Sequence, residues 1–519
     1  MSRAVPQREP AVPDDWELVV GLEVHVELST ATKLFCGCAN RFGDEPNTNV
    51  CPVCLGLPGS LPVANAEAVD CAMRLGRALG CEVRGAVFAR KNYFYPDMPK
   101  DYQISQYDQP TNTDGRLELP DGHTVGIERA HIEEDTGKTT HIGGGGRIHD
   151  ADYALVDYNR AGVPLVEIVS RPDIRTAEQA RAYVRELRAI LLAIDVSDAR
   201  MEEGSMRVDA NVSVRPTGSD ELRTRCEIKN LSSLRALGRA IVYEAQRHVD
   251  LWSGGERPRQ ETRHWDEANG RTTPGRSKED ADDYRYFQDP DLVPLAPAVE
   301  KIAAIDAALP PLPAARRADL VEAARRASLA ILTGKPQPSD PDAREAPAPD
   351  APEPVSPETA ALLVERGQDG LVRAAMAEGA DPELTATRVT NDLAIDDWSS
   401  VTPEGLAALV AMEASEQITA TQSKQVLAEM AERGGAPEEI ARRRGFRAMA
   451  GDDLAAVVDG VIADNPDAWS RYRAGDDAER KKLSGFLTGQ VMRATKGQAD
   501  GAAVNRLLQE RAGPTSQLA

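Results

Sequence analysis

One change in the spacing of apolar residues constrains this chain more than any other feature of its sequence. From Trp16 to about Leu295, apolar and polar residues alternate in short segments separated by Gly, Asn and Asp. Alternation with a period of two is typical of strands that bury one face. From about residue 296 onward, the apolar residues instead recur every three or four positions, which is the spacing of amphipathic helices. The sequence therefore predicts an α+β fold, in which a large strand-rich domain with an antiparallel sheet precedes all-helical parts.

Composition and boundary signals divide the chain of 519 residues further. At about 150 residues per domain, this length suggests three or four domains. We expect a disordered lead-in at 1–14, a strand-rich domain at 15–295, a helical domain at 296–400 and a helical tail at 401–519. Residues 336–357 are rich in Pro, Ala and acidic residues. This composition predicts a disordered insert, because it cannot form a packed core.

Helix boundaries are signalled most clearly at four places. In the strand-rich domain, one clear helix is expected over Thr176–Leu192, with Thr176 as its N-cap. In the tail, Thr402 followed by proline is typical of a helix start, and the glycine pair at Gly434 is typical of a helix end. A further helix is expected to begin at Pro466.

The charge of the chain limits its classes of partner. It carries 61 Lys and Arg against 83 Asp and Glu, a formal net charge of −22. This excess of acid argues against bulk electrostatic coating of nucleic acid and against docking on an anionic membrane. Residues 401–519 are closer to neutral and contain basic clusters at 442–444 and 480–482, so we expect the tail to capture a structured RNA locally. No apolar run is long enough for a membrane helix and no signal peptide is evident, which predicts a cytoplasmic protein.

Four of the seven cysteines lie close together in a C-x-C pair and a C-x2-C pair: Cys36, Cys38, Cys51 and Cys54. Each short pair can supply two thiolates from one turn, and zinc prefers tetrahedral sulfur ligands. We expect a structural zinc ion, because four thiolates leave no open position for catalysis. Four buried thiols in a loop are the alternative. A redox pair is less favoured, because no thioredoxin-like pattern surrounds it.

A second set of candidate residues lies on the polar faces of predicted strands. In the first predicted strand, the aliphatic residues share one face, and Glu23, His25 and Glu27 share the other. Asp209 lies on the polar face of a later strand in the same way. For any single strand, a solvated outer face is the simpler explanation.

Glu167 is harder to explain as a surface residue. It lies inside the apolar segment VPLVEIVS, and a carboxylate in a short aliphatic strand is seldom buried without a partner or a metal. The acidic pair Glu133 and Glu134 ends another predicted strand. Several carboxylates with one histidine suit Mg²⁺, which prefers oxygen ligands and usually also binds phosphate. These residues therefore indicate nucleotide chemistry.

Two familiar motifs do not fit this chain. The stretch 135–139 resembles the end of a phosphate-binding P-loop, but Ile132 occupies the position where that motif needs glycine. The G-x-S-x-G motif of acyl hydrolases is also missing from the sequence. A site for ATP in this chain would therefore be of another kind.

Longer motifs, in order along the chain, are similar to those of one protein family. They are GLEVH (21–25), RKNYFYPD (90–97), YQISQYD (102–108), MEEGS (201–205), DANVS (209–213), EIKNL (227–231), DYRYF (283–287), GFLTGQVM (485–492) and TKG (495–497). Together they extend over nearly the whole chain and resemble the B subunits of the aspartyl/glutamyl-tRNA amidotransferases (GatB). Two positions depart from the family pattern: Asp282 replaces a frequent histidine, and Gln288 replaces a frequent proline.

The resemblance implies a reaction and a set of partners. In this family, a partner amidase (the A subunit) releases ammonia from glutamine, and a small C subunit completes the complex. The B subunit uses ATP and Mg²⁺ to phosphorylate the misacylated Glu or Asp on its tRNA, and ammonia then replaces the phosphate. The strand-rich front would be the family's cradle domain, which holds the kinase site. The helical tail would bind the tRNA.

The resemblance also implies roles for particular residues. The implied Mg²⁺ ligands are His25, Glu134 and Glu167; the implied catalytic residues around them are Glu23, Glu203, Asp209 and, for contact with phosphate or with the end of the tRNA, Lys91. The alternatives are a non-catalytic tRNA-binding scaffold with structural zinc and an unrelated zinc-ribbon protein. Convergence of the three implied ligands on one point is the observation that would separate these interpretations.

Overall fold

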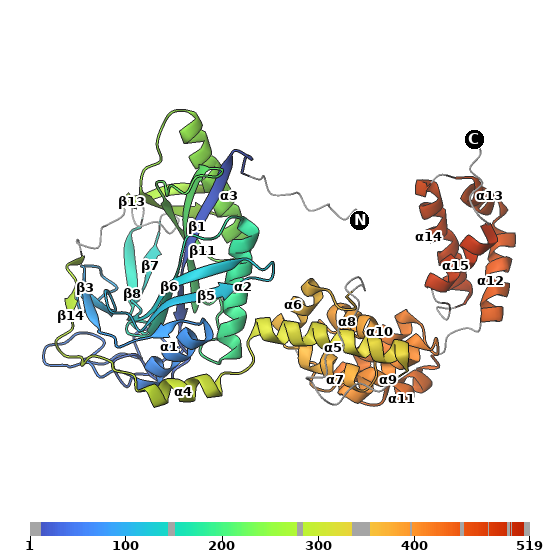
Figure 1. Cartoon of the computed structure of the whole chain (residues 1–519), viewed down its shortest axis with the longest axis horizontal. Coiled ribbons are helices and arrows are strands. Elements are labelled where there is room, and N and C mark those ends of the chain that lie inside the picture. The colour runs from blue at the N-terminus through green and yellow to red at the C-terminus, as the bar shows by residue number, and fades with distance from the viewer. Residues whose placement is uncertain are drawn as a thin grey trace. The chain divides into compact units, whose positions relative to one another are not determined.

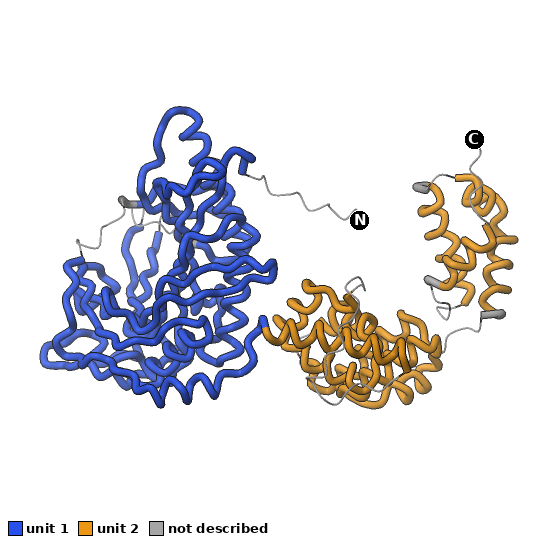
Figure 2. The backbone as a smooth tube through the Cα atoms, viewed as in Figure 1, with its two compact units in different colours: residues 1–314 blue, residues 315–519 orange. Residues whose placement is uncertain are grey.

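The computed structural model describes residues 12–143, 151–277, 284–334, 353–394, 397–446, 451–475, 477–495, 499 and 501–512. The chain divides into two compact units, residues 1–314 and 315–519 (Figures 1 and 2). The predicted lead-in lies outside the described residues as far as residue 11, and so does most of the predicted insert, as far as residue 352. The end of that insert was predicted wrongly, because Val355 is buried in a helical core and Ser356 caps the next helix.

The first unit is built on a nine-stranded sheet with the order β13-β12-β11-β10-β1-β9-β6-β5-β2. Its strands are β1 (Trp16–Glu27), β2 (Glu82–Val83), β5 (Asn112–Glu118), β6 (Thr124–Glu134), β9 (Pro164–Ser170), β10 (Met206–Pro216), β11 (Cys226–Leu231), β12 (Glu261–Asp266) and β13 (Arg271–Ser277). Neighbouring strands run antiparallel except for β11 and β12, which are parallel. The predicted antiparallel sheet is therefore a mixed sheet, and the α+β class is confirmed.

The central strand β1 has the predicted alternation. From Leu22 to Glu27, buried aliphatic residues alternate with half-buried polar ones. It pairs antiparallel with β10 on one side and β9 on the other. The strand β10 alternates in the same way, and in β9 Val166 and Ile168 share the apolar face, so these residues join those of β1 in the main core. The opposite face is left for polar side chains.

Three helices cover the apolar face: α1 (Ala66–Ala78), α2 (Ala177–Ala193) and α3 (Leu234–Ser253) (Figure 1). The predicted helix is confirmed as α2, and the side chain of Thr176 accepts a hydrogen bond from the backbone N–H of Gln179. The other two helices were missed. Helix α3 connects the parallel strands β11 and β12, because two parallel neighbouring strands require a crossover connection.

Smaller elements complete the first unit. A three-stranded sheet has the order β14-β3-β4 (Phe287–Gln288, Ala89–Asn92 and Tyr102–Ser105), and β7 pairs with β8 (Lys138–Ile142 and Tyr153–Asp157). Helix α4 (Val299–Ala308) packs against α1, where Arg77 binds Asp306 at 2.7 Å and Lys301 binds Asp70. The first unit therefore extends beyond the predicted boundary at residue 295.

The second unit is helical, as predicted. Its helices are α5 (Pro313–Thr333), α6 (Pro357–Glu365), α7 (Asp369–Ala377), α8 (Pro382–Asp392), α9 (Pro403–Ala414), α10 (Ala420–Arg433), α11 (Pro437–Arg444), α12 (Gly451–Asp464), α13 (Pro466–Ala474), α14 (Asp477–Ala494) and α15 (Gly501–Ala512). The starts after Thr402 and at Pro466 and the end at Gly434 are confirmed.

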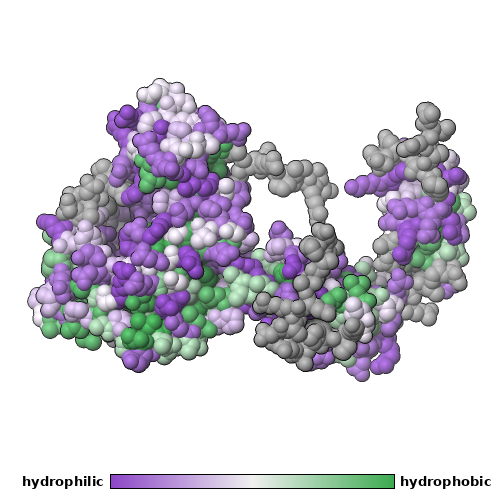
Figure 3. Space-filling view, in the orientation of Figure 1, coloured by the Kyte–Doolittle hydropathy of each residue, from purple (hydrophilic) through white to green (hydrophobic). Residues whose placement is uncertain are grey.

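Two hydrophobic cores lie in the second unit. The first includes residues from Leu320 to Ala441, and the second includes residues from Leu454 to Leu508. The predicted boundary at residue 400 does not separate cores, because Val401 and Leu406 belong to the first one. None of the helices in the described residues is long and apolar enough to cross a membrane. In Figure 3, hydrophilic residues cover much of the visible face of the first unit, and a hydrophobic area lies on its lower part.

Candidate functional site

The polar face of the central sheet brings a row of ionisable side chains together. In the register of the strands, His25 of β1 lies beside Glu167 of β9, and Glu167 lies beside His131 of β6. Glu133 is two residues after His131 on the same strand and therefore shares its face. We call these four residues the histidine–carboxylate group.

Distances within the histidine–carboxylate group are short. The Nε2 atom of His25 lies 3.6 Å from Oε1 of Glu133 and 3.8 Å from Oε2 of Glu167. The Nε2 atom of His131 lies 3.2 Å from the same Glu167 oxygen. An octahedral Mg²⁺ shell with 2.1 Å bonds separates adjacent ligands by about 3 Å and opposite ligands by about 4 Å. The donor set and its spacing therefore fit a divalent cation.

Glu134 does not take part in this group, and here the implied ligand set needs correction. As the neighbour of Glu133 in a strand, it points to the other face of β6. Its carboxylate accepts hydrogen bonds from Lys100 and from the backbone N–H of Ile104, at 2.8 Å for the latter. It lines a small cavity of about 60 Å³ beside Cys54. Glu133 occupies the place that was predicted for Glu134.

The charge balance of the group favours an added cation. Among the described residues, the ion-pair partners of Glu133 and Glu167 within 4.0 Å are histidines. Burial alone would raise the pKa of Glu167, but the charge and hydrogen bond of His131 and the charge of His25 lower that pKa well below its ordinary value. The charge of Arg129 lowers this pKa further, so the Glu167 carboxylate stays ionised.

A cleft of about 600 Å³ opens over the group. Its walls include both acids and bases, among them Lys91, Asp135, Arg207, Asp209 and Lys229. Arg207 binds Asp135 at 2.7 Å, and Lys229 binds Asp209 at 2.9 Å. Lys91 makes no ion pair with an acidic residue in the described part of the chain; its Nζ lies 4.5 Å from the centre of the Tyr284 ring. Lys91 is thus the basic group most available to an anion.

Of the other predicted catalytic residues, two lie on the polar face of the sheet and one lies in an exposed turn. Glu23 lies opposite Asp209 in the β1–β10 register and accepts a hydrogen bond of 2.8 Å from Asn211, so both acids lie on the polar face as predicted. Asp209 lines the cleft. Glu203 is exposed in the turn before β10, binds Arg200 at 2.8 Å and is not among the residues that line the cleft.

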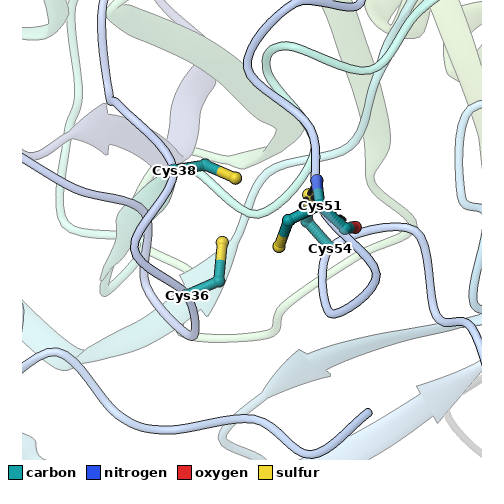
Figure 4. A group of neighbouring side chains, drawn as sticks. All are labelled: Cys36, Cys38, Cys51 and Cys54. Carbon is teal, nitrogen blue, oxygen red and sulfur yellow. Dashed lines mark hydrogen bonds between the residues drawn. The ribbon is translucent and has the colours of Figure 1, made fainter.

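The predicted cysteine group comes together between two loops (Figure 4). The sulfur atoms of Cys36, Cys38, Cys51 and Cys54 all lie within 4.8 Å of one another. The Cys51 and Cys54 sulfurs are 3.9 Å apart, close to the edge of about 3.8 Å in a tetrahedron with 2.3 Å zinc–sulfur bonds. The four thiols can hold a metal ion.

A buried lysine accompanies the cysteine group. Lys33 is fully buried, and its Nζ lies 3.8 Å from the Cys54 sulfur and 3.2 Å from the Tyr158 carbonyl oxygen. A hydrogen bond from Cys36, with help from the Cys51 backbone N–H and from Lys33, lowers the pKa of Cys54 to about 5 in spite of burial. The thiolate form is therefore favoured at Cys54, whereas the hydrogen bond with Cys54 raises the pKa of Cys36 and burial raises the pKa of Cys38.

A third cluster with ligand-type side chains lies under helix α3. Cys226, Glu244 and His248 are buried and approach within 4.8 Å. This α3 group already holds cations, because Arg247 binds Glu244 and also donates to the Cys226 sulfur at 3.4 Å. Arg263 lies 3.4 Å from Glu244. The α3 group is therefore a buried ion-pair network whose carboxylate is already paired with arginines.

Sequence reasoning missed His131 as a member of the histidine–carboxylate group, and within the acidic pair it assigned Glu134 instead of Glu133 as the ligand. A signal for this was present, because His131 and Glu133 are two residues apart in one predicted strand and therefore share a face. The side that faces the site, however, depends on the register between β6 and β9, which the sequence of β6 does not contain.

Comparisons with known proteins cover both units. The model of the GatB/GatE catalytic domain matches residues 18–303, and the model of the GatB domain matches residues 372–511. The chain is 48% identical over 517 residues to the B subunit of the aspartyl/glutamyl-tRNA(Asn/Gln) amidotransferase of Frankia casuarinae, covering 96% of both chains. It is 46% identical to the proteins of the same description from Thermobifida fusca, over 96% of this chain and 94% of that one, and from Mycobacterium tuberculosis, over 95% and 94%.

Proposed function

This chain belongs to the family of aspartyl/glutamyl-tRNA(Asn/Gln) amidotransferase B subunits, and from that premise we propose that it amidates the misacylated Glu or Asp carried by tRNA. One observation carries the proposal. The histidine–carboxylate group lies at a cleft large enough for a nucleotide, with Lys91 at its wall. Donors of this kind bind Mg²⁺ together with phosphate.

In the proposed reaction, an oxygen of the aminoacyl carboxylate attacks the γ-phosphorus of ATP, and ADP leaves. Ammonia then attacks the carbonyl carbon of the acyl phosphate and loses a proton, and inorganic phosphate leaves. The first step is needed because a carboxylate has no good leaving group. The products are Gln-tRNA or Asn-tRNA, ADP and phosphate.

The residues of the chain have distinct parts in this proposal. Glu133, Glu167 and His25 would hold Mg²⁺, which when bound neutralises charge on the transferring phosphoryl group. His131 keeps Glu167 ionised and orients it through their 3.2 Å contact. Lys91 attracts phosphate oxygens, since it has no acidic partner among the described residues.

The second polar pair of the sheet would position the substrate. Asp209 lines the cleft and is held by Lys229, while Glu23 is held by Asn211. The Asp209 carboxylate can accept hydrogen bonds from ribose hydroxyls or from the aminoacyl ammonium group, and Glu23, which lies opposite it and outside the cleft lining, would support it from β1. We assign no such part to Glu203, because it is bound to Arg200 in an exposed turn.

We also propose that ammonia comes from a separate amidase, the A subunit, and that a small C subunit completes the enzyme. The relatives are named as the B subunit of an amidotransferase, which supports a complex of several subunits. The cysteine group would hold a structural zinc ion, and its spacing supports this assignment.

The deciding experiment is a reconstitution. The chain, co-purified with the two partner subunits, is expected to convert Glu-tRNA(Gln) or Asp-tRNA(Asn) to the amide with glutamine, ATP and Mg²⁺. Omitting ATP should stop amide formation while glutamine hydrolysis is still possible. A complex that binds the misacylated tRNA but forms no acyl phosphate or amide would instead favour a scaffold without catalysis.

A further inference from the structure

Four tyrosine rings form a connected series beside the cleft. Tyr107 stacks on Tyr286, with ring centres 4.4 Å apart and planes 6° from parallel. Tyr284 meets Tyr286 edge to face at 6.2 Å, and Tyr93 meets Tyr284 in the same way at 6.2 Å. We call Tyr93, Tyr107, Tyr284 and Tyr286 the tyrosine wall.

The tyrosine wall runs from solvent to the histidine–carboxylate group. At its outer end, Tyr107 is 49% exposed. Two residues before it, the hydroxyl of Ser105 donates to Glu133 at 3.4 Å. The pairing of Phe287 with Arg90 places the neighbouring Tyr286 beside Lys91, which lines the cleft. Burial and then the charges of Glu133 and Glu167 raise the pKa of Tyr286, in keeping with this position.

The backbone that carries two of these rings is held in a specific shape. Arg285, between Tyr284 and Tyr286, has φ = 45°, a conformation that is costly for a residue with a Cβ atom. The side-chain amide of Asn92 donates to the Arg285 carbonyl oxygen at 2.9 Å and lies 3.3 Å from the Tyr284 carbonyl oxygen. Such local strain persists only where its surroundings fix it, and it is concentrated at functional sites.

An exposed tyrosine stacked on a second ring is a surface for another flat group. Bases of unpaired nucleotides stack on aromatic side chains without regard to sequence, and nearby cations attract their phosphates. Lys91, over the Tyr284 ring, supplies such a cation. A substrate that presents flat bases next to the group to be phosphorylated is a tRNA, whose aminoacyl ester is attached to an unpaired end.

We propose that the tyrosine wall binds the unpaired 3′ end of the misacylated tRNA by stacking, with Tyr107 as the outermost platform. The inference rests on the proposed function, because the aminoacyl group must reach the histidine–carboxylate group. Tyr107 is then a positioning residue: it fixes the end of the tRNA and takes no part in bond making. Its removal should weaken binding of the substrate and leave the chemical step nearly unchanged.

The test uses the complete three-subunit enzyme with Tyr107→Ala, Tyr107→Trp and, as a matched control, Phe42→Ala. Phe42 is an exposed aromatic residue of the same unit that is not part of the tyrosine wall. Because one stacked base is lost, Tyr107→Ala is expected to raise the KM for misacylated tRNA by about 5-fold to 150-fold. The value of kcat should change little, and Tyr107→Trp and Phe42→Ala should keep the wild-type KM.

A second measurement does not depend on turnover. In Tyr107→Trp, the added indole fluorescence should be quenched by tRNA with its full unpaired end and not by tRNA trimmed of those nucleotides. An unchanged KM in Tyr107→Ala, or quenching that is the same with trimmed tRNA, would overturn the inference. A wild-type enzyme that forms no amide would overturn the proposed function instead, and the fluorescence difference would still decide whether the wall stacks bases.

Discussion

Two clusters in the first unit combine histidine with carboxylate, and they differ in what surrounds them. The histidine–carboxylate group lies at a cleft, and the ion-pair partners of its acids among the described residues are histidines. The α3 group is sealed under a helix, and Glu244 there is matched by Arg247 and Arg263. Ligand-type residues are therefore not sufficient for a metal site. Access to a cleft, and acids whose direct ion-pair partners in the described residues are histidines instead of arginines, distinguish the two.

The largest expected effect is on catalysis. In the complete enzyme, Glu167→Gln should lower kcat/KM for amidation by about 100-fold to 1000-fold, because charge stabilisation at the reacting phosphoryl group is lost. Binding of Mn²⁺, followed by electron paramagnetic resonance, should weaken in parallel, whereas tRNA binding should stay close to wild type. Normal turnover of this variant would show that the histidine–carboxylate group is not the catalytic metal site.

The cysteine group adds a third case to the comparison, because it is partly exposed and the cation hydrogen-bonded to it among the described residues is Lys33. We expect about one equivalent of zinc in the purified protein by elemental analysis. Replacing Cys51 and Cys54 together by serine should remove it and destabilise the fold. The Cys226→Ser variant is the matched control and should leave the zinc content unchanged; a protein without zinc would indicate plain buried thiols.

Glu244→Gln is expected to act on stability instead of metal binding. It removes the fully buried carboxylate that pairs with Arg247 and Arg263 and leaves Glu261 as their acidic partner, which should cost about 3 kcal/mol in the free energy of unfolding. Denaturant unfolding of the chain measures this, with Glu167→Gln as the comparison that should lose much less. If Glu244→Gln lost Mn²⁺ binding under conditions where the protein is folded, the α3 group would also contribute to metal binding, which would contradict the comparison.

The acid sensitivity of wild type and Glu244→Gln should also differ. Burial alone would raise the pKa of Glu244, but the nearby His248 and Arg247 side chains and Thr272 lower it from 4.5 to about 2. An acid with a lowered pKa stabilises the fold above its ordinary pKa and stops doing so as pH falls through the folded value. Between about pH 5 and pH 2, the stability advantage of wild type over Glu244→Gln should therefore shrink by about 3 kcal/mol. Unfolding curves at several pH values would show a constant difference if the inference is wrong.

The smallest predicted effect concerns one hydroxyl. Thr272 donates to Glu244 at 2.7 Å and accepts from Arg263 at 2.8 Å, so Thr272→Val should cost about 2 kcal/mol of stability. Ser105→Ala removes only the 3.4 Å contact with Glu133 and should cost less than about 0.5 kcal/mol. Equal losses of stability in the two variants, measured by thermal or denaturant unfolding, would mean that the α3 group and the histidine–carboxylate group depend equally on neighbouring hydroxyls.

Local patterns predicted much of this molecule. The alternation in β1 identified the strand and its polar face, a threonine cap located α2, and cysteine spacing located the group in Figure 4. Glu167 was singled out because a carboxylate in an aliphatic segment needs a partner, and it proved to lie between two histidines.

What could not be predicted depends on contacts between distant segments. The choice between Glu133 and Glu134 requires the register of β6 against β9, and a shift of one residue exchanges them. Helix α4 belongs to the first unit because Lys301 pairs with Asp70 and Asp306 pairs with Arg77. The sequence of α4 alone does not predict these ion pairs. The tyrosine wall joins residues of three separate segments in the same way.

The position of β1 in the sheet has a consequence for how the protein is made. This strand begins at Trp16, yet its two partners end at Ser170 and Pro216. At 5–20 residues per second, a ribosome needs roughly 10 to 40 s to extend the chain from the first strand to the last of these partners. Until β9 is made, this strand has neither of its two partners, and until β10 is made it lacks one, so an unpaired edge is open to aggregation. Synthesis of this protein should therefore depend on chaperone protection of its nascent N-terminal segment more than its final stability would suggest.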